Sequence, residues 1–281
     1  MKSKKKKSNT HIIPLIILLS GILVILLSVI FSSYFKSLIT NTFNSITDKN
    51  WVYKGNDIYY CKDDVMATGW QKINNRFYFF NPDGTLEKQM KMIDVSEHQG
   101  YVDWNAVKQE GIQIAMLRCS YGWKDFPAQV DKTFEQNYKN AKAAGLKIGV
   151  YHYSYATNRE EAVLEANYVK KALKGKEIDF EVAYDIEDDD IHEGMTSKQF
   201  NELVYAFCNE IENAGYIPML YSNSNLINKL YDDNGEFDLW IADYNGNCNY
   251  NNDFLVWQYT DTGLISGIDG FTDFNIRYFK P

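Results

Sequence analysis

The stretch "IQIAMLRCSYGWKDFPAQVDKTFEQNYKNAKAAGLKIGVYHYSYA", residues 112–156, decides the fold. It begins with an apolar extended run (112–122), continues with a helical pattern (130–145) and ends with a second extended run (147–156). A strand, a helix and a strand in this order form the basic unit of β/α proteins. The architecture therefore depends on whether the neighbouring segments repeat this unit.

The same alternation recurs from Met92 to the end of the chain. Helical patterns follow "MIDVS" and "EVAYDIE", and Thr196 or Ser197 and Gly215 suit the start and the end of the helix after the second run. The last three runs have short connections with little room for full helices. The predicted strands are 92–96, 112–122, 147–156, 181–187, 217–223, 239–244, 254–260 and 271–279. The pattern predicts an α/β fold, a TIM-like (β/α) barrel whose last three strands are poor in helices.

Composition and charge narrow the class of protein. The chain is 45% hydrophobic and 15% aromatic, which excludes global disorder. Residues 1–50 carry seven Lys and one Asp, whereas residues 51–281 carry 22 Lys and Arg against 36 Asp and Glu. An acidic body of this kind disfavours a nucleic-acid partner.

Residues 12–35 form an uncharged apolar run of 24 residues. At about 1.5 Å per residue, a helix of this length spans a hydrocarbon core of about 30 Å. The run is too long for a cleavable signal peptide, and only a poor cleavage site follows it. Five Lys precede it, so the positive-inside rule places residues 1–11 in the cytoplasm and the rest outside. We predict a single-pass membrane anchor at 12–35, a stalk at 36–50 and an extracellular body.

Residues 51–90 contain an aromatic repeat with a period of 19 residues, seen in Trp51 and Trp70 and in Tyr59 and Tyr78. The repeat predicts β-hairpins in about two copies. The stretch "GWQKINNRFYFFNPDGTL" resembles the cell-wall-binding repeats of bacterial choline-binding and glucan-binding proteins, whose aromatics form cages for wall polymer groups. A structural spacer against the next domain is an equally weighted alternative, because two copies are few for a stacked repeat.

Acidic and aromatic side chains end several predicted strands. Asp185 and Glu187 are two residues apart, so they share one face of a strand. Asp94 would converge on them, because functional groups of such barrels lie at the carboxyl ends of the strands. Repulsion between carboxylates separates their pKa values, so that Glu187 can stay protonated as an acid. Together with aromatic walls, which suit the apolar faces of sugar rings, these acids predict glycoside hydrolysis.

The opening "MIDVSEHQGYVDWNAVKQEGIQIAMLRCSYG" resembles that of the family 25 glycoside hydrolases, bacterial and phage lysozymes that cleave peptidoglycan. The motifs "AAGLKIGVYHYSYA", "AYDIE", "LYSN", "LWIADY", "LVWQYT" and "GIDGFTDFN" match later signatures of that family in order. The resemblance covers about residues 92–281 and implies a catalytic barrel at 91–281. It implies an N-acetylmuramidase that cleaves the β-1,4 bond from N-acetylmuramic acid to N-acetylglucosamine, without metal or cofactor.

The same resemblance implies roles for individual residues. Glu187 corresponds to the general acid, and Asp185 to a partner that assists the substrate's N-acetyl group or activates water. Asp94 and Asp273 match the other two acids of the cleft. His98 stands where family members often have an aromatic residue. It could be a structural hydrogen-bonding residue, which is the favoured role, or a substrate contact. The candidate sugar contacts are Tyr151, Tyr153, Tyr221, Tyr244, Trp257 and Gln258.

Other functions fit parts of the sequence. A non-catalytic protein that holds wall glycan is one alternative, but it would not need to retain all four acids. A metal-dependent deacetylase would need His-rich ligand spacing that the chain lacks. Asp188–Asp190 with His192 lack the spacing of a calcium loop, which favours a solvated acidic loop. The expected partners are peptidoglycan glycan strands and the membrane, and tethering favours wall remodelling or local opening of the wall for a secretion or transfer machine.

Overall fold

The computed structural model describes residues 49–192 and 194–281, so the predicted tail, membrane anchor and nearly all of the stalk lie outside the described residues. In the part of the chain that is described, no helix is long and apolar enough to cross a membrane. Contacts between residues divide the chain into two units, Met1–Met66 and Ala67–Pro281. Each unit is therefore described by itself.

A three-stranded antiparallel sheet makes up the described part of the first unit. β1 (Trp51–Lys54) pairs with β2 (Asp57–Lys62), which pairs with β3 (Val65–Met66). Trp51 lies opposite Tyr60, and their rings meet edge to face with centroids 5.0 Å apart. This geometry is one that aromatic pairs favour. The first copy of the repeat thus forms a hairpin, as predicted.

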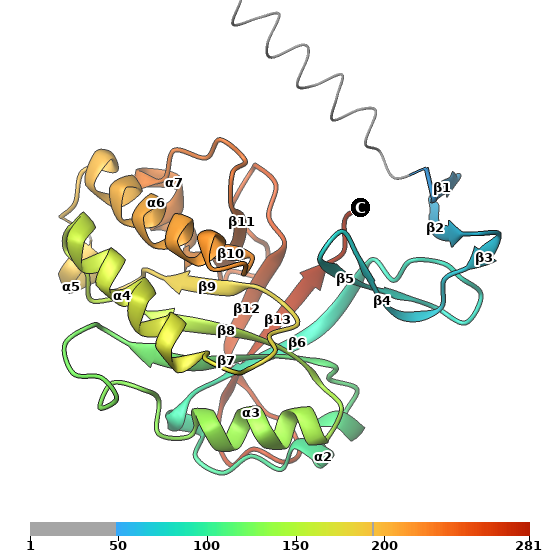
Figure 1. The fold of residues 1–281 in the computed structure, drawn as a ribbon, viewed down its shortest axis with the longest axis horizontal. Coiled ribbons are helices and arrows are strands. Elements are labelled where there is room, and N and C mark those ends of the chain that lie inside the picture. Colours follow the sequence, from blue (N-terminus) through green and yellow to red (C-terminus); the bar gives the residue numbers. More distant parts are fainter. Residues whose placement is uncertain (1–48, 193) are drawn as a thin grey trace, which may run out of the picture. The chain divides into compact units, whose positions relative to one another are not determined.

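Eight strands close into a barrel in the second unit (Figure 1). The order around the barrel follows the chain, so that strands adjacent in sequence are also adjacent in space. The strands are β6 (Gln89–Val95), β7 (Ile114–Tyr121), β8 (Lys147–Tyr153), β9 (Val182–Asp185), β10 (Pro218–Asn223), β11 (Asp238–Ala242), β12 (Val256–Gly263) and β13 (Thr272–Tyr278). Each overlaps one of the predicted runs, and the predicted eight-stranded α/β barrel is confirmed.

The last strand departs from a TIM barrel. β6 to β12 run parallel to their neighbours, but β13 is antiparallel to both β12 and β6. Only residues 264–271 connect β12 to β13. A parallel crossover needs a dozen or more residues, so this short connection reverses the final strand. The TIM-like prediction did not include that reversal.

Helices cover the outside of the barrel. They are α2 (Trp104–Gln109), α3 (Phe134–Ala143), α4 (Arg159–Ala172), α5 (Asp189–His192), α6 (Ser197–Asn213) and α7 (Ser224–Leu230), with a short 3-10 helix η1 (Glu97–Gln99). α4 and α6 lie side by side (Figure 1). Thr196 caps α6 by accepting a hydrogen bond from the backbone N–H of Gln199. Tyr184 of β9 stacks on Phe207 of α6 with centroids 3.9 Å apart. Outward-facing strand residues thus form the core beneath the helices.

The second copy of the repeat is a hairpin that packs on the barrel. β4 (Gly69–Ile73) pairs with β5 (Arg76–Phe80) in the register of the first copy, so that Trp70 lies opposite Phe79. The Trp70 ring also meets Phe180 and Phe279, with centroids 5.9 and 6.0 Å away. Both phenylalanines lie at the end of the barrel where the parallel strands begin. The hairpin therefore covers that end, the floor of the barrel.

Four charged side chains join this hairpin to the strands. The Arg277 guanidinium donates to both carboxylate oxygens of Glu181 at 2.7 and 2.8 Å. Arg76 of β5 lies 2.6 Å from Asp238 and 3.6 Å from Glu181. Because Glu181 and Arg277 are almost fully buried, each needs the opposite charge of its partner. We call these four residues the floor cluster.

The two hairpins fall in different units of the chain. The sequence predicts both copies of the repeat in one segment, 51–90, whereas the structure places the second copy in the unit that begins at Ala67. Trp70 of the second copy packs on barrel residues.

Candidate active site

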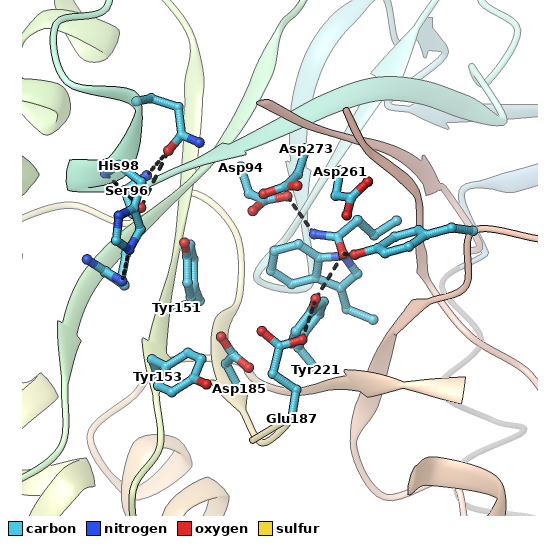
Figure 2. Close-up of a pocket in the computed structure, with 15 residues that line it drawn as sticks. Asp94, Ser96, His98, Tyr151, Tyr153, Asp185, Glu187, Tyr221, Asp261 and Asp273 are labelled. Carbon is cyan, nitrogen blue, oxygen red and sulfur yellow. Dashed lines mark hydrogen bonds between the residues drawn. The ribbon is translucent and has the colours of Figure 1, made fainter. Parts of the chain in front are cut away.

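A pocket of about 320 Å³ opens at the carboxyl ends of the parallel strands, opposite the floor (Figure 2). The predicted site residues that line it are Asp94, Asp185, Glu187, Asp273, Tyr151, Tyr153, Tyr221, Tyr244 and Gln258. They come from β6, β8, β9, β10, β12 and β13 and from the loops after β9 and β11. The structure therefore brings together acids that lie up to 179 residues apart in the sequence, from Asp94 to Asp273.

Trp257 is the predicted site residue that does not line the pocket. Its indole N–H donates to the carbonyl oxygen of Asp243 at 2.8 Å. Successive residues of a strand point to opposite faces, and Gln258 points into the barrel, so its neighbour Trp257 points outward. Strand alternation alone could have separated these two residues, because adjacent positions do not share a face.

Asp94 and Asp273 form a carboxyl pair, because β6 and β13 place them directly opposite one another. Burial, and then the charge of Asp273, raise the pKa of Asp94 well above its usual value. Burial also raises the pKa of Asp273 to about 6. Two buried carboxylates this close do not both ionise easily, so the pair titrates as a unit.

Amide groups orient the Asp94 carboxyl. Its Oδ2 accepts hydrogen bonds from Asn275 Nδ2 at 2.8 Å and from Gln258 Nε2 at 3.1 Å. Asn275 is held in turn by Trp240, whose indole N–H donates to Asn275 Oδ1 at 2.7 Å. The orientation of the carboxyl is thus set by buried neighbours, which is the preorganisation that an active site requires.

Asp185 is the buried acid at the end of β9, and it is only 3% exposed. Burial, followed by the charges of Glu187 and Asp94, raises its pKa well above the usual value, against the opposing charge of Arg118. Its Oδ1 has no hydrogen-bond partner among the described residues. A buried carboxyl oxygen without a partner is costly, and in a pocket it is available to a ligand. Repulsion between the two carboxylates was expected to keep Glu187 protonated; in the structure the acid with the raised pKa is Asp185, and burial is the chief cause.

A chain of hydrogen bonds links Glu187 to Asp94 (Figure 2). The Tyr221 hydroxyl lies 3.1 Å from Glu187 Oε2 and 2.8 Å from Gln258 Oε1. The Tyr244 hydroxyl donates to the same Gln258 oxygen at 2.6 Å. Since the amide of Gln258 donates to Asp94, one glutamine couples the two sides of the pocket.

Arg118 brings a positive charge to the wall of the pocket. Its Nε donates to Asp131 Oδ2 at 2.8 Å, and its Nη2 donates to Glu97 Oε1 at 3.1 Å. His98 also lines the pocket, and its Nε2 lies 3.4 Å from Nη1 of Arg118. Both carboxylates that bind Arg118 lie outside the group of acids described above, so the guanidinium does not neutralise those acids by direct contact.

Several lining residues were not predicted. They are Ser96, Gln99, Arg118, Trp240 and Asp261, and His98 was singled out without a firm role. Alternation could have found Trp240, which shares a face with Tyr244 four residues later. Asp261 follows a register irregularity between β12 and β13, so a simple period of two could not place it.

The acidic segment after Glu187, expected as a solvated loop, continues into α5 and supports the structure around the pocket. Asp188 Oδ1 accepts from the backbone N–H of Ile191, and Asp188 Oδ2 accepts from the Tyr153 hydroxyl at 3.3 Å. The His192 ring is buried and lies 3.3 Å from the carbonyl oxygen of Ala156. Across residues 49–192 and 194–281, no group of three or more His, Cys, Asp or Glu side chains has the arrangement of a metal site.

Comparison with known proteins agrees with this arrangement. The model of the glycosyl hydrolases family 25 matches residues 93–268. The chain belongs to this family. The match covers the barrel from β6 to the loop after β12.

Individual relatives show how far the similarity extends. The chain is 32% identical over 190 residues to a protein named autolytic lysozyme from Clostridium acetobutylicum, a match that covers 66% of this chain and 54% of that protein. The chain thus spans about half the length of that relative. Among solved structures, it resembles the modular autolysin LytC from Streptococcus pneumoniae, with a TM-score of 0.60, 22% identity and coverage of 82% of this chain and 58% of LytC. A family 25 glycosyl hydrolase from Bacillus anthracis gives a TM-score of 0.59 at 21% identity, over 69% of this chain and 90% of that one. Both likenesses concern the fold.

Proposed function

We propose that this family 25 protein is a peptidoglycan hydrolase, an N-acetylmuramidase that cleaves the β-1,4 bond between N-acetylmuramic acid and N-acetylglucosamine. The observation that carries the proposal is the convergence of Asp94, Asp185, Glu187 and Asp273 in one aromatic-lined pocket. Paired carboxyl groups are what glycosidic cleavage requires. The 32% identity to a protein named autolytic lysozyme supports this substrate class.

Glu187 is the general acid in this proposal. The Tyr221 hydroxyl has one proton and faces two acceptors, Glu187 and Gln258. When Tyr221 donates to Gln258, its oxygen can accept a hydrogen bond from a protonated Glu187. That proton passes to the glycosidic oxygen as the bond to the anomeric carbon breaks. The chain from Glu187 to Gln258 thus accommodates the acid form.

Asp185 takes the complementary role. A carboxylate with a raised pKa is a stronger base than an ordinary aspartate, so it can polarise the N–H of the substrate's N-acetyl group or take a proton from the attacking water. Its unpartnered Oδ1 is the atom available for this contact. The Asp94–Asp273 pair, when it holds one proton, keeps one negative charge that stabilises the cationic sugar of the transition state.

The regions around the barrel suggest where the enzyme acts. The uncharged run 12–35, with Lys residues before it, supports attachment to the cell membrane with the barrel on the wall side. The aromatic hairpin β1–β2 supports contact with wall polymers. A tethered hydrolase reaches only nearby wall, which suits remodelling or local opening of the wall for a secretion or transfer machine.

The test uses the full chain in detergent with purified peptidoglycan. We expect the wild type to release fragments with muramic acid at the reducing end, identified by mass spectrometry after reduction. Glu187→Gln should release far less, whereas Glu212→Gln, a matched change on the exposed side of α6, should keep the activity. Wild-type protein that binds peptidoglycan but releases no such ends would favour the alternative, a non-catalytic glycan-binding protein.

A further inference from the structure

Exposed apolar side chains of the second unit gather around the mouth of the pocket. Among the described residues 67–281, Leu164 is the exposed large hydrophobic residue that lies on a helix. The others lie on loops at the mouth or beside it: Tyr101, Phe126, Tyr155, Tyr244, Leu264 and Phe271. Exposed apolar surface concentrated beside a functional pocket indicates a binding surface, and a polymer would cross this surface on leaving the pocket.

Tyr155 is the member of this set that continues the aromatic wall of the pocket. Its ring centroid lies 5.4 Å from that of Tyr153, which lines the pocket. The Tyr121 ring lies 6.4 Å from the Tyr155 ring. Neither Tyr155 nor Tyr121 lines the pocket itself. The three rings therefore form a continuous series that starts inside the pocket and ends outside it.

The Tyr155 backbone is held by a buried carboxylate. Its N–H donates to Glu165 Oε1 at 2.7 Å, and Glu165 is fully buried. The hydroxyls of Ser154 and Tyr184 both donate to Glu165 Oε2 at 2.8 Å. The segment that carries Tyr155 is thus fixed to α4 and β9, so little conformational entropy is lost when a ligand binds to the ring.

The Tyr155 ring packs against the backbone of Gly122, where a side chain would not fit. Gly122 has a φ of +57°, and a Cβ atom built there would lie 3.0 Å from Cδ2 of Tyr155 and 2.6 Å from Nε2 of Gln129. The ring therefore lies against the backbone at Gly122. A larger residue would displace the ring or the glutamine, so both the position and the exposure of Tyr155 depend on this glycine.

The chemistry of these rings suits a sugar. Pyranose rings present apolar C–H faces that pack on aromatic rings, and their hydroxyl groups can bond to tyrosine hydroxyls. The pocket, at about 320 Å³, is at the small end of ligand sites, which measure about 300–1,000 Å³. A strand longer than the pocket must continue over its rim, and Tyr155 offers an exposed ring there.

We propose that Tyr155 and Tyr121 form an outer subsite that holds a sugar ring of an extended glycan strand, beyond the rings bound in the pocket. This inference rests on the proposed function for the identity of the polymer. It implies that the protein prefers long glycan strands over short fragments, because short fragments do not reach the outer subsite.

The test measures binding separately from hydrolysis. In the full-length Glu187→Gln protein in detergent, affinities for long, peptide-free glycan strands and for the disaccharide unit are compared by calorimetry. Adding Tyr155→Ala should lower the ratio of the two affinities by about three- to tenfold, the range expected for loss of one aromatic contact. Tyr155→Phe should keep most of the ratio, since it keeps the ring. Leu164→Ala removes an exposed apolar side chain from α4 and should leave the ratio at the parent value.

The outcomes separate the two proposals. An unchanged ratio in both Tyr155→Ala and Tyr121→Ala would overturn the subsite, whether or not the wild type hydrolyses peptidoglycan. An equal loss for strand and disaccharide would also overturn it, because that result would mean a damaged pocket. If the ratio falls as expected while the wild type releases no muramic acid ends, the subsite stands and the proposed hydrolysis does not.

Discussion

The two ends of the barrel carry the same kind of side chain in opposite settings. At the floor, Glu181 receives two hydrogen bonds from Arg277, and Asp238 lies 2.6 Å from Arg76. At the mouth, Asp94, Asp185 and Asp273 take part in none of the ion pairs of the described residues. Burial raises the pKa of acids at both ends, but the charges of Arg76 and Arg277 oppose the rise for Asp238 at the floor. At the mouth, no cation offsets burial by direct contact. Acids at the floor thus contribute to stability, and acids at the mouth are left reactive at some cost to stability.

The largest expected effect is on catalysis at the mouth. Glu187→Gln should lower kcat by about 10²- to 10⁴-fold, the usual contribution of a general acid, while the melting temperature stays at or above the wild-type value. Release of reducing ends and a thermal melt on the same preparation measure both properties. A variant that keeps its rate would remove Glu187 from the mechanism.

The matched change at the floor should act on stability instead. Glu181→Gln leaves the buried Arg277 guanidinium without its counter-charge, and breaking such a pair costs about 3–5 kcal/mol. The folded fraction should keep a near-normal kcat well below the melting temperature, because the floor does not touch the pocket. Denaturant unfolding gives the free energy. If Glu181→Gln is as stable as the wild type, the contrast between the two ends is wrong.

The stability of the folded protein should also depend on pH, because the Asp273 carboxyl at the mouth titrates. Burial raises the pKa of Asp273 to about 6, above about 3.9 in an unfolded chain. The folded state therefore binds this proton more tightly, and the resulting stability is fully present below about pH 4 and is lost as the pH rises through about 6. Wild-type protein should melt at a lower temperature at pH 7 than at pH 5.

Asp273→Asn removes one titrating carboxyl of the pair, and with it the charge that raises the pKa of Asp94. The asparagine does not titrate, so the difference in melting temperature between pH 5 and pH 7 should shrink in the variant. Equal pH dependence in the two proteins would mean that Asp273 does not titrate between pH 5 and pH 7 in the folded state.

The smallest expected effect is at the edge of the floor. The Arg76 side chain is 37% exposed, so solvent weakens its ion pairs, and Arg76→Ala should cost about 1 kcal/mol, or about 2–4 °C in melting temperature. Lys72→Ala, which removes an exposed cation from the same hairpin, is the matched control. If the two variants melt alike, the hairpin is held by the packing of Trp70 rather than by charge.

The sequence could predict the mouth better than the floor for a physical reason. Asp185 and Glu187 are recognisable from their spacing of two residues, with Asp185 at the carboxyl end of β9 and Glu187 just beyond it. Glu181 and Arg277 are 96 residues apart and meet only when the barrel closes, so no local pattern pairs them. The antiparallel direction of β13 could have been predicted from the sequence, because the connection before it is too short for a parallel crossover.

The packing of the β4–β5 hairpin on the barrel limits where the barrel can be joined to another protein. The family match begins at residue 93, yet Arg76 and Trp70, which complete the floor, precede that boundary. A fusion joined at residue 93 would contain the barrel without Trp70 and Arg76, which complete its floor. We therefore expect the smallest exchangeable unit to begin at Ala67, where the contacts divide. A fusion protein that keeps the barrel should also keep the second hairpin, because Trp70 and Arg76 contact barrel residues.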